Sequence, residues 1–188
     1  MKQSEGTQIP AGRVNRSFVL LLLLLAGVEC FCNAQTKTHQ NMITIKDDEA
    51  AIKALEQRFA AAVNAGDVDA IMKNYIPDKS LVVFDVVPRK EYQGADAYRQ
   101  DWIDFYTHYK GLPKFSVVDL NVTVEGNVAF SYSFTHITGT DMQGHAVDRT
   151  VRVTAGYRKV NGSWLKVLEH ISVPVDLKTG KGEFNSKP

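Results

Sequence analysis

Residues 147–174 read VDRTVRVTAGYRKVNGSWLKVLEHISVP, and this stretch decides the fold of the chain. In its first half, mainly apolar side chains alternate with mainly polar ones with a period of two, which is typical of a β-strand. The dipeptide Asn161-Gly162 follows and predicts a hairpin, because a type I′ turn needs positive φ at both central residues. The return segment is rich in aliphatic and β-branched residues until Pro174, which has no N–H to donate to a neighbouring strand. The sequence therefore predicts two long antiparallel strands whose apolar face must be covered by other elements.

The N-terminal residues 1–34 have the pattern of a signal peptide. Basic residues precede an apolar run over residues 18–28 that contains six consecutive leucines. The run is too short to cross a bilayer comfortably, but it has the length of a signal-peptide hydrophobic region. Small residues before the end of the segment place cleavage near Ala34. We therefore expect an exported protein, periplasmic or secreted, with membrane attachment only in the alternative that this segment stays uncleaved.

Composition limits the partners of the processed chain. Both cysteines, Cys30 and Cys32, lie in the predicted signal peptide, so no disulfide is expected after cleavage. The segment holds three basic and two acidic residues of the 22 and 21 in the whole chain, which leaves basic and acidic residues in equal number. Without a basic excess, the sequence predicts no binding to nucleic acid or to an anionic membrane.

Three helices are expected in the first half of the remaining chain. Residues 35–46 are polar and lack periodicity, and we expect them to form a flexible leader. Apolar residues at spacings of three and four then predict a helix capped by Asp47 or Asp48 and stopped by Gly66. Asp67 is expected to cap a second, short helix. A third helix is expected to begin near Gly94 and to carry an aromatic stripe. The stripe consists of Tyr98, Trp102, Phe105 and Tyr109.

Strands dominate the second half. Residues 81–87 form the first expected strand, and residues 88–93 are expected to be a polar loop. Two further strands, over residues 115–124 and 128–138, precede the closing hairpin, so four consecutive strands are expected to be antiparallel. We place the domain at residues 47–176 and a C-terminal tail at residues 177–188. Helices followed by a run of strands indicate an α+β fold, with three helices on one side of a twisted sheet and a cleft between the two layers.

Three stretches resemble one known superfamily. They are QRFAAAVNAGDVDAIMKNYIPD at residues 57–78, LVVFDVVPRKEYQGADAYRQDW at residues 81–102, and VRVTAGYRKVNGSWLKVLEHISVPVDLKTG at residues 151–180. Together they resemble the nuclear-transport-factor-2-like (NTF2-like) superfamily, and specifically its SnoaL-like, ketosteroid-isomerase-like branch. The resemblance implies an α+β cone in which three N-terminal helices pack on a strongly curved, mainly antiparallel sheet. It also implies a homodimer formed through the outer sheet face, but no single reaction, so function has to be argued from the site.

The resemblance permits a test of steroid isomerisation. Isomerases of this fold use a carboxylate base together with a tyrosine and a protonated aspartate as hydrogen-bond donors. Asp85 stands near the position of the base. Phe59 stands at the position of the donor tyrosine, and Ala155 or Gly156 at that of the donor aspartate, and none of these side chains can donate. Because losing one such donor lowers the rate by roughly 100- to 1000-fold, we do not expect steroid isomerisation by this route.

Polar residues on the predicted strands are the remaining candidates for chemistry. If Trp164 faces the core, strict alternation puts His170 on the same face, where it would serve as a general acid or base beside Asp85. A structural histidine bonded to the backbone remains open as the alternative. Arg152 either faces inward, toward Asp85 or a ligand carboxylate, or faces solvent or a dimer partner. His136 is a further candidate for ligand contact.

Tyr75 and Trp102 are the expected aromatic walls of a binding pocket, because each combines a large apolar surface with a polar group. A plain core role for the aromatic stripe remains open. No spacing of histidines and acids matches a defined metal motif, and we expect neither a metal nor a cofactor. The sequence thus predicts an exported protein that binds a small, partly apolar molecule, with Asp85 and His170 as the residues for any isomerase- or lyase-like acid–base step. The alternative is a non-catalytic accessory module that serves dimerisation.

Overall fold

The computed structural model describes residue 42 and residues 44–185, and the residues from Thr44 onward belong to one compact unit. The predicted signal peptide and residues 35–41 of the predicted leader lie outside the described residues. None of the described helices is both long enough and apolar enough to span a membrane.

Three helices precede or interrupt the strands, as predicted. The first is helical over residues 44–65 and ends at Gly66, whose φ of 68° confirms the left-handed position expected there. The second, α2 (Val68–Met72), is capped by Asp67, whose carboxylate accepts the amide of Ala70 at 2.9 Å. The third, α3 (Ala95–Thr107), begins after Gly94.

The start of the first helix differs from the prediction. Residues 44–46, which we expected in the leader, are helical, so Asp47 and Asp48 lie inside the helix and cap nothing. Asp48 instead accepts hydrogen bonds from Lys159 Nζ at 2.6 Å and from Trp164 Nε1 at 2.9 Å. Both donors belong to the closing hairpin, so this carboxylate holds the helix against the end of the sheet.

Six strands form one mixed sheet in the order β2-β1-β6-β5-β4-β3. Their bounds are β1 Val82–Phe84, β2 Tyr92–Gln93, β3 Lys114–Glu125, β4 Val128–Thr140, β5 Ala146–Val160 and β6 Ser163–Ser172. β3 to β6 are consecutive and antiparallel, as predicted, whereas β1 pairs parallel with β6. β1 is shorter than the predicted strand over residues 81–87, and two residues of the predicted loop form β2, because they pair with β1.

The closing hairpin has the predicted turn and one irregularity. Asn161 and Gly162 have φ angles of 50° and 82°, the positive values that a type I′ turn requires. Further along, Tyr157 pairs with Lys166 and Gly156 pairs with Leu168, so Val167 is an extra residue in β6. A bulge of this kind moves every following side chain to the opposite face of the sheet.

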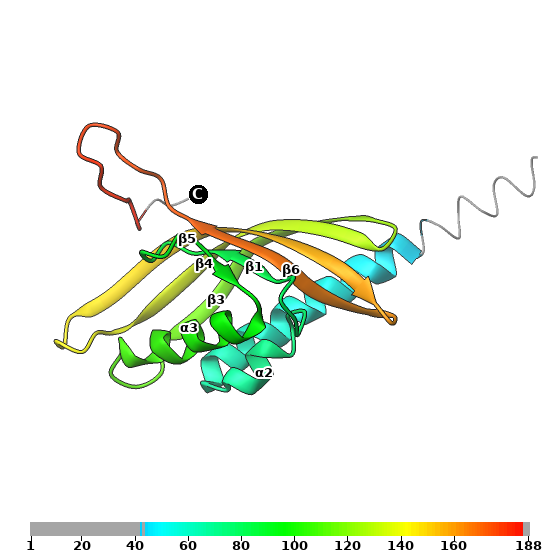
Figure 1. Ribbon diagram of the computed structural model, residues 1–188. Helices are drawn as coiled ribbons and strands as arrows, with labels where there is room; N and C mark the ends of the chain where they lie inside the picture. Colours follow the sequence, from blue (N-terminus) through cyan, green and yellow to red (C-terminus); the bar gives the residue numbers. More distant parts are fainter. Residues whose placement is uncertain (1–41, 43, 186–188) are drawn as a thin grey trace, which may run out of the picture. The chain divides into compact units, whose positions relative to one another are not determined.

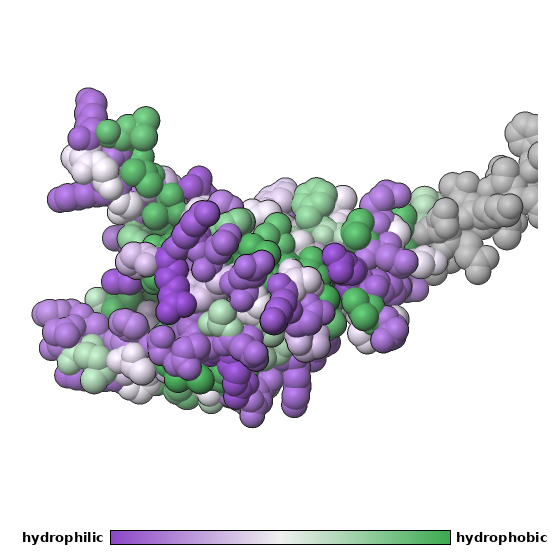
Figure 2. All heavy atoms as spheres, viewed as in Figure 1, coloured by the Kyte–Doolittle hydropathy of each residue, from purple (hydrophilic) through white to green (hydrophobic). Residues whose placement is uncertain are grey.

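All three helices lie on the same side of the curved sheet (Figure 1). Buried side chains of the helices and of β1 form the larger core cluster, which includes Phe59, Val63, Ile71, Tyr98 and Trp102. A second cluster lies under the N-terminal half of the first helix and contains Ile52, Leu55, Tyr157 and Trp164. The surface over α2 and α3 is mainly hydrophilic, with separate hydrophobic patches (Figure 2). The apolar faces of the helices and of the sheet therefore meet in the interior. Any cavity between these layers forms where the curved sheet bends away from the helices.

Candidate functional site

A cavity of about 610 Å³ lies between the helices and the inner face of the sheet. Its walls come from the first helix, α3, the loop after β1 and the inward faces of β3 to β6. Aromatic side chains supply much of the lining: Phe59, Tyr92, Tyr98, Trp102, Phe105, Tyr109, Phe115 and Phe184. Exposed residues at its rim, such as Arg89, Gln143 and Arg149, show that it is open to solvent. A volume of this size suits a small organic ligand.

A buried lysine between two glutamates forms the inner end of the cavity. Lys166 is 1% exposed, and its Nζ lies 2.8 Å from Glu169 Oε1 and 3.1 Å from Glu56 Oε2. The same Nζ lies 3.7 Å from the centroid of the Phe59 ring. Burial alone would lower the pKa of Lys166, but the two carboxylates raise it above its ordinary value. The Lys166 ammonium group therefore stays charged.

Tyrosine hydroxyls satisfy the remaining oxygens of both glutamates. Tyr75 and Tyr98 each donate to Glu169 Oε2 at 2.8 Å, and Tyr157 donates to Glu56 Oε1 at 2.6 Å. Burial and the nearby carboxylates raise the pKa of all three tyrosines well above the usual value, so they remain protonated donors. This fully bonded network gives the inner end of the cavity a rigid geometry.

Two further carboxyl groups face each other on the cavity wall. Asp85 follows β1 directly and Asp101 lies on α3, close enough for each carboxyl group to influence the pKa of the other. Burial, with the charges of Asp101 and Glu169, raises the pKa of Asp85 to about 6. Burial also raises the pKa of Asp101, against hydrogen bonds from Tyr92 and Asp85 that lower it. Asp85 therefore takes up and releases a proton around pH 6, as a general acid or base needs to do.

Trp102 supplies a hydrogen-bond donor with no partner. The side chain lines the cavity and is 7% exposed. Its Nε1 is the single buried side-chain nitrogen or oxygen that lacks a hydrogen-bond partner among the described residues. A buried donor left unpaired is unfavourable by about 1–3 kcal/mol, and an acceptor atom of a bound molecule would remove that penalty.

The structure brings together some of the residues expected at the site. Asp85 and Trp102 line the cavity, as does Phe59 at the position where a donor tyrosine would stand. Tyr75 lies behind the wall: it is 1% exposed and acts through Glu169. It is therefore a positioning residue and not a wall of the pocket.

His170 and Arg152 lie on the other face of the sheet. Both side chains are exposed and neither lines the cavity. The prediction that His170 shares the face of Trp164 is wrong, because the bulge at Val167 reverses the alternation between them. His170 instead packs edge-on against Phe84. The sequence left two orientations open for Arg152, and the structure has the outward one.

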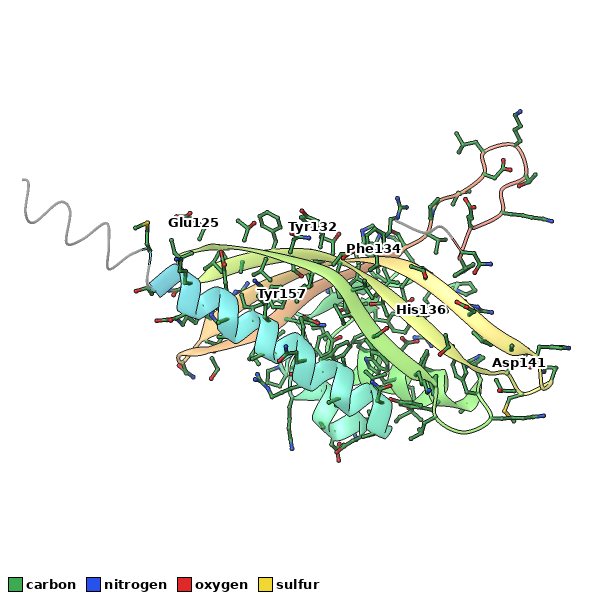
Figure 3. The ribbon with its side chains drawn as sticks, turned by 180° about the vertical axis from the view of Figure 1, so that it is seen from behind. Glu125, Tyr132, Phe134, His136, Asp141 and Tyr157 are labelled. Carbon is green, nitrogen blue, oxygen red and sulfur yellow. The ribbon has the colours of Figure 1, made fainter. Side chains whose placement is uncertain are left out.

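His136 also faces away from the cavity. It is not among the residues that line the cavity, so the structure does not place it at the ligand contact expected from the sequence. It lies on the outer face with Tyr132, and its Nε2 lies 2.8 Å from Asp148 Oδ1. Figure 3 shows Tyr132 on the side of the sheet away from the helices, and Tyr157 between the sheet and the first helix. Within residues 44–185, no three histidine, cysteine or acidic side chains are grouped so that they could bind a metal.

Sequence reasoning missed the glutamates and the lysine of the network, although two of them left a signal. Glu56 lies four residues after Ile52 and three before Phe59, on the apolar face of the first helix. Lys166 lies two residues after Trp164, so alternation already put it inside. Glu169 could not be found in this way, because its orientation depends on the bulge.

The C-terminal tail contributes to the rim of the cavity. The amide of Thr150 donates to the carbonyl of Phe184 at 2.6 Å, and the guanidinium of Arg149 lies 5.3 Å from the Phe184 ring centroid. Phe184 itself is among the lining residues. The part of the predicted tail that the structure describes is thus attached to β5 beside the opening.

Comparison with known proteins assigns the architecture. The SnoaL-like domain family matches residues 52–176. An NTF2-like protein of unknown function from Pseudomonas putida KT2440 has a TM-score of 0.68 and 28% identity, over 76% of this chain and 98% of that one. An NTF2-like superfamily protein from Salmonella enterica serovar Typhimurium has a TM-score of 0.63 and 18% identity, over 76% and 99%. A ketosteroid isomerase-like protein from Erwinia carotovora has a TM-score of 0.56 and 22% identity, over 65% and 93%. No curated protein matches the chain.

Proposed function

The chain belongs to the SnoaL-like domain family of the NTF2-like superfamily, and from that premise we propose that it binds a small, partly apolar molecule in its cavity and transfers a proton to or from it through Asp85. One observation carries the proposal: an open cavity of about 610 Å³ that contains both a carboxyl group with a pKa of about 6 and an unpaired indole N–H.

The binding part of the proposal is supported by the lining. Aromatic rings supply apolar contact area, and Trp102 Nε1 offers a donor to a ligand oxygen. If the cavity had only a structural role, filling it with side chains would stabilise the fold, and the donor would not be left without an acceptor.

The proton-transfer part rests on Asp85. With a pKa of about 6, this group is present in both protonation states near neutral pH, and Asp101 beside it can take over its proton. Removal of an acidic carbon-bound hydrogen from the ligand, followed by its return at the same or a neighbouring carbon, needs no cofactor.

Binding is tested by amide chemical shifts of isotope-labelled protein titrated with the neutral probe 2-(1-naphthyl)ethanol. Val151 and Ile171 line the cavity, whereas Arg152 and His170 lie on the same strands and face outward. We expect the larger shifts at the first two residues, and their loss in Val153→Trp, which fills the cavity. Shifts confined to the outward residues, or no shift at saturating probe, would contradict binding in the cavity.

Proton transfer is tested on any small molecule that co-purifies with the protein, identified by native mass spectrometry. In ²H₂O we expect the protein to catalyse deuterium incorporation at a carbon of that molecule. Asp85→Asn should abolish the exchange and His170→Asn should leave it intact. Equal exchange by the Asp85 variant would remove the assigned role from this carboxyl group.

The accessory alternative is supported by a different surface. The outer face of the sheet exposes several large apolar side chains: Val118, Val128, Phe130, Tyr132 and Leu168, which are 38–56% exposed. An apolar face of this kind is typical of an interface between protein chains. We propose that it forms the homodimer expected from the sequence, which is compatible with a functional cavity on the opposite face.

A further inference from the structure

The ligand class follows from the charge and the rings of the cavity. We propose that the cavity takes an organic cation, a molecule with an apolar body and a protonated amine whose nitrogen lies against Asp85 and Asp101. This inference rests on the proposed binding function and narrows it to one chemical class.

The lining is acidic although the chain is nearly neutral. Six carboxyl groups line the cavity against three lysine or arginine side chains, whereas the whole chain has a net charge of +1. The acidic members are Glu56, Asp85, Asp101, Asp104, Asp141 and Glu169, and the basic members are Arg89, Arg149 and Lys166. Both arginines and Asp104 are exposed at the rim, which leaves more carboxyl groups than basic groups inside it. Inside the rim, Lys166 is the one basic side chain of the lining, and it is already bonded to two glutamates. The interior therefore attracts a positive charge and repels an anion.

Aromatic rings lie beside these carboxyl groups in the lining. Trp102 stands at the centre of the aromatic lining, with its ring centroid 5.4 Å from that of Phe105 and 5.9 Å from that of Tyr98. The negative face of an aromatic ring attracts a cation, and the attraction is strongest for tryptophan. Carboxylates beside such rings form the type of site that distinguishes an amine from an alcohol of the same shape.

The cavity already shows how it stabilises an ammonium group. Lys166 Nζ is held by two carboxylates, lies 3.7 Å from the Phe59 ring centroid and 5.2 Å from that of Tyr75, and is fully buried. The wall formed by Asp85, Asp101 and Trp102 repeats this combination of paired acids and aromatic rings. There, however, the carboxyl groups lie beside each other, with Tyr92 next to Asp101, and no lysine or arginine is ion-paired with them among the described residues. An ammonium group from a ligand would occupy the equivalent place.

Binding of a cation should also displace the proton of Asp85. Charged and titratable groups around the Asp85–Asp101 pair come from several elements: Asp104 and Tyr98 from α3, Tyr92 from β2, Arg89 from the loop before it, and Glu169 from β6. Of these, Arg89 is the one cation, and it lies 5.3 Å from the Tyr92 ring centroid. An amine at the pair would favour two ionised carboxylates, so its affinity should rise as the pH increases through about 6.

The test uses three probes that share one ring system: 2-(1-naphthyl)ethylamine, 2-(1-naphthyl)ethanol and 1-naphthaleneacetate. Isothermal titration of the full domain at pH 7.5 should show the amine binding at least about tenfold more tightly than the alcohol, and the acetate most weakly. Asp101→Asn should remove most of the advantage of the amine and leave the affinity for the alcohol within about twofold. Asp96→Asn, on the exposed side of the same helix, should change neither affinity.

The outcomes separate this inference from the function on which it rests. If the alcohol or the acetate binds in the cavity as tightly as the amine, the cation preference is wrong and the binding function stands. If the amine keeps its advantage in Asp101→Asn, or binds with an affinity that falls between pH 5.5 and 7.5, the assigned place of the nitrogen is wrong. If none of the three probes binds, both the ligand class and the proposed binding function are contradicted, because the alcohol is also the probe of the amide-shift experiment.

Discussion

Lys166 and Glu169 lie three residues apart on β6, yet both side chains are buried on the same face, with Nζ 2.8 Å from Oε1. Regular alternation would put them on opposite faces. The extra residue at Val167 brings them together. A single bulge thus assembles the charged end of the cavity and, in the same step, turns His170 outward.

Removing the buried cation should be strongly destabilising. In Lys166→Met two buried glutamates lose their shared counter-ion, so we expect the free energy of unfolding to fall by about 3–5 kcal/mol. Urea denaturation at pH 7 measures the change, and Lys114→Met on an exposed part of β3 is the control. Adding Glu56→Gln and Glu169→Gln to Lys166→Met should recover much of the loss. A single variant as stable as the wild type would mean that the glutamates are not ionised in the folded protein.

Tyr75 should matter for stability and not for ligand affinity. Tyr75→Phe leaves one buried oxygen of Glu169 with fewer donors, which should cost about 1–3 kcal/mol. Because Tyr75 does not line the cavity, probe affinity should stay within about twofold. Thermal denaturation and titration of the same sample give both numbers. A large loss of affinity without a loss of stability would place Tyr75 in the binding surface.

The free energy of unfolding should depend on pH through the ionisation of Asp85. Its pKa is raised from 3.8 to about 6 on folding, so the contribution of this group is most favourable below pH 4 and is lost as the pH rises through about 6. Asp85→Asn should therefore be more stable than the wild type at pH 7, on the order of 1–3 kcal/mol, and the difference should vanish near pH 4. Urea midpoints across this range measure it. A variant less stable than the wild type at pH 7 would show that the ionised carboxylate is favourably bound in the fold.

The indole N–H of Trp102 should contribute to affinity only for ligands that carry an acceptor. In Trp102→Phe we expect binding of 2-(1-naphthyl)ethanol to weaken by about 1 kcal/mol more than binding of 1-ethylnaphthalene, which has no oxygen. The difference between the two probes cancels the effect of the smaller ring. Equal weakening would mean that the ligand oxygen does not reach Nε1.

The outer sheet face should control association. Phe130 is 52% exposed on β4, and Phe130→Glu should convert the expected dimer to a monomer, because a charge would be buried in an apolar interface. Sedimentation velocity measures the mass. Ile103→Glu, at a similarly exposed apolar position on α3, should leave the dimer intact. A wild-type protein that is monomeric at micromolar concentration would exclude this interface.

Much of the fold follows from local patterns in the sequence. The spacing of apolar residues, the Asp67 cap, Gly66 and the Asn161-Gly162 turn act within a few residues, and each has the predicted conformation. Local patterns were less informative for β1 and β2, because strands this short form only by pairing with neighbouring strands. They were misleading for Asp47 and Asp48, which have the identity of helix caps but lie within a longer helix.

Local periodicity and the family resemblance were sufficient to predict the α+β class and the order of the elements. They also predicted Asp85 and Trp102 as cavity residues. The charged network of Lys166, Glu56 and Glu169 and the pairing of Asp85 with Asp101 arise only when distant segments pack together. The physical reason lies in β6, where one unpaired residue reverses which side chains after it point into the core and which point outward. Neither composition nor periodicity records whether such a residue is present, because its position is set by the register of the neighbouring strand.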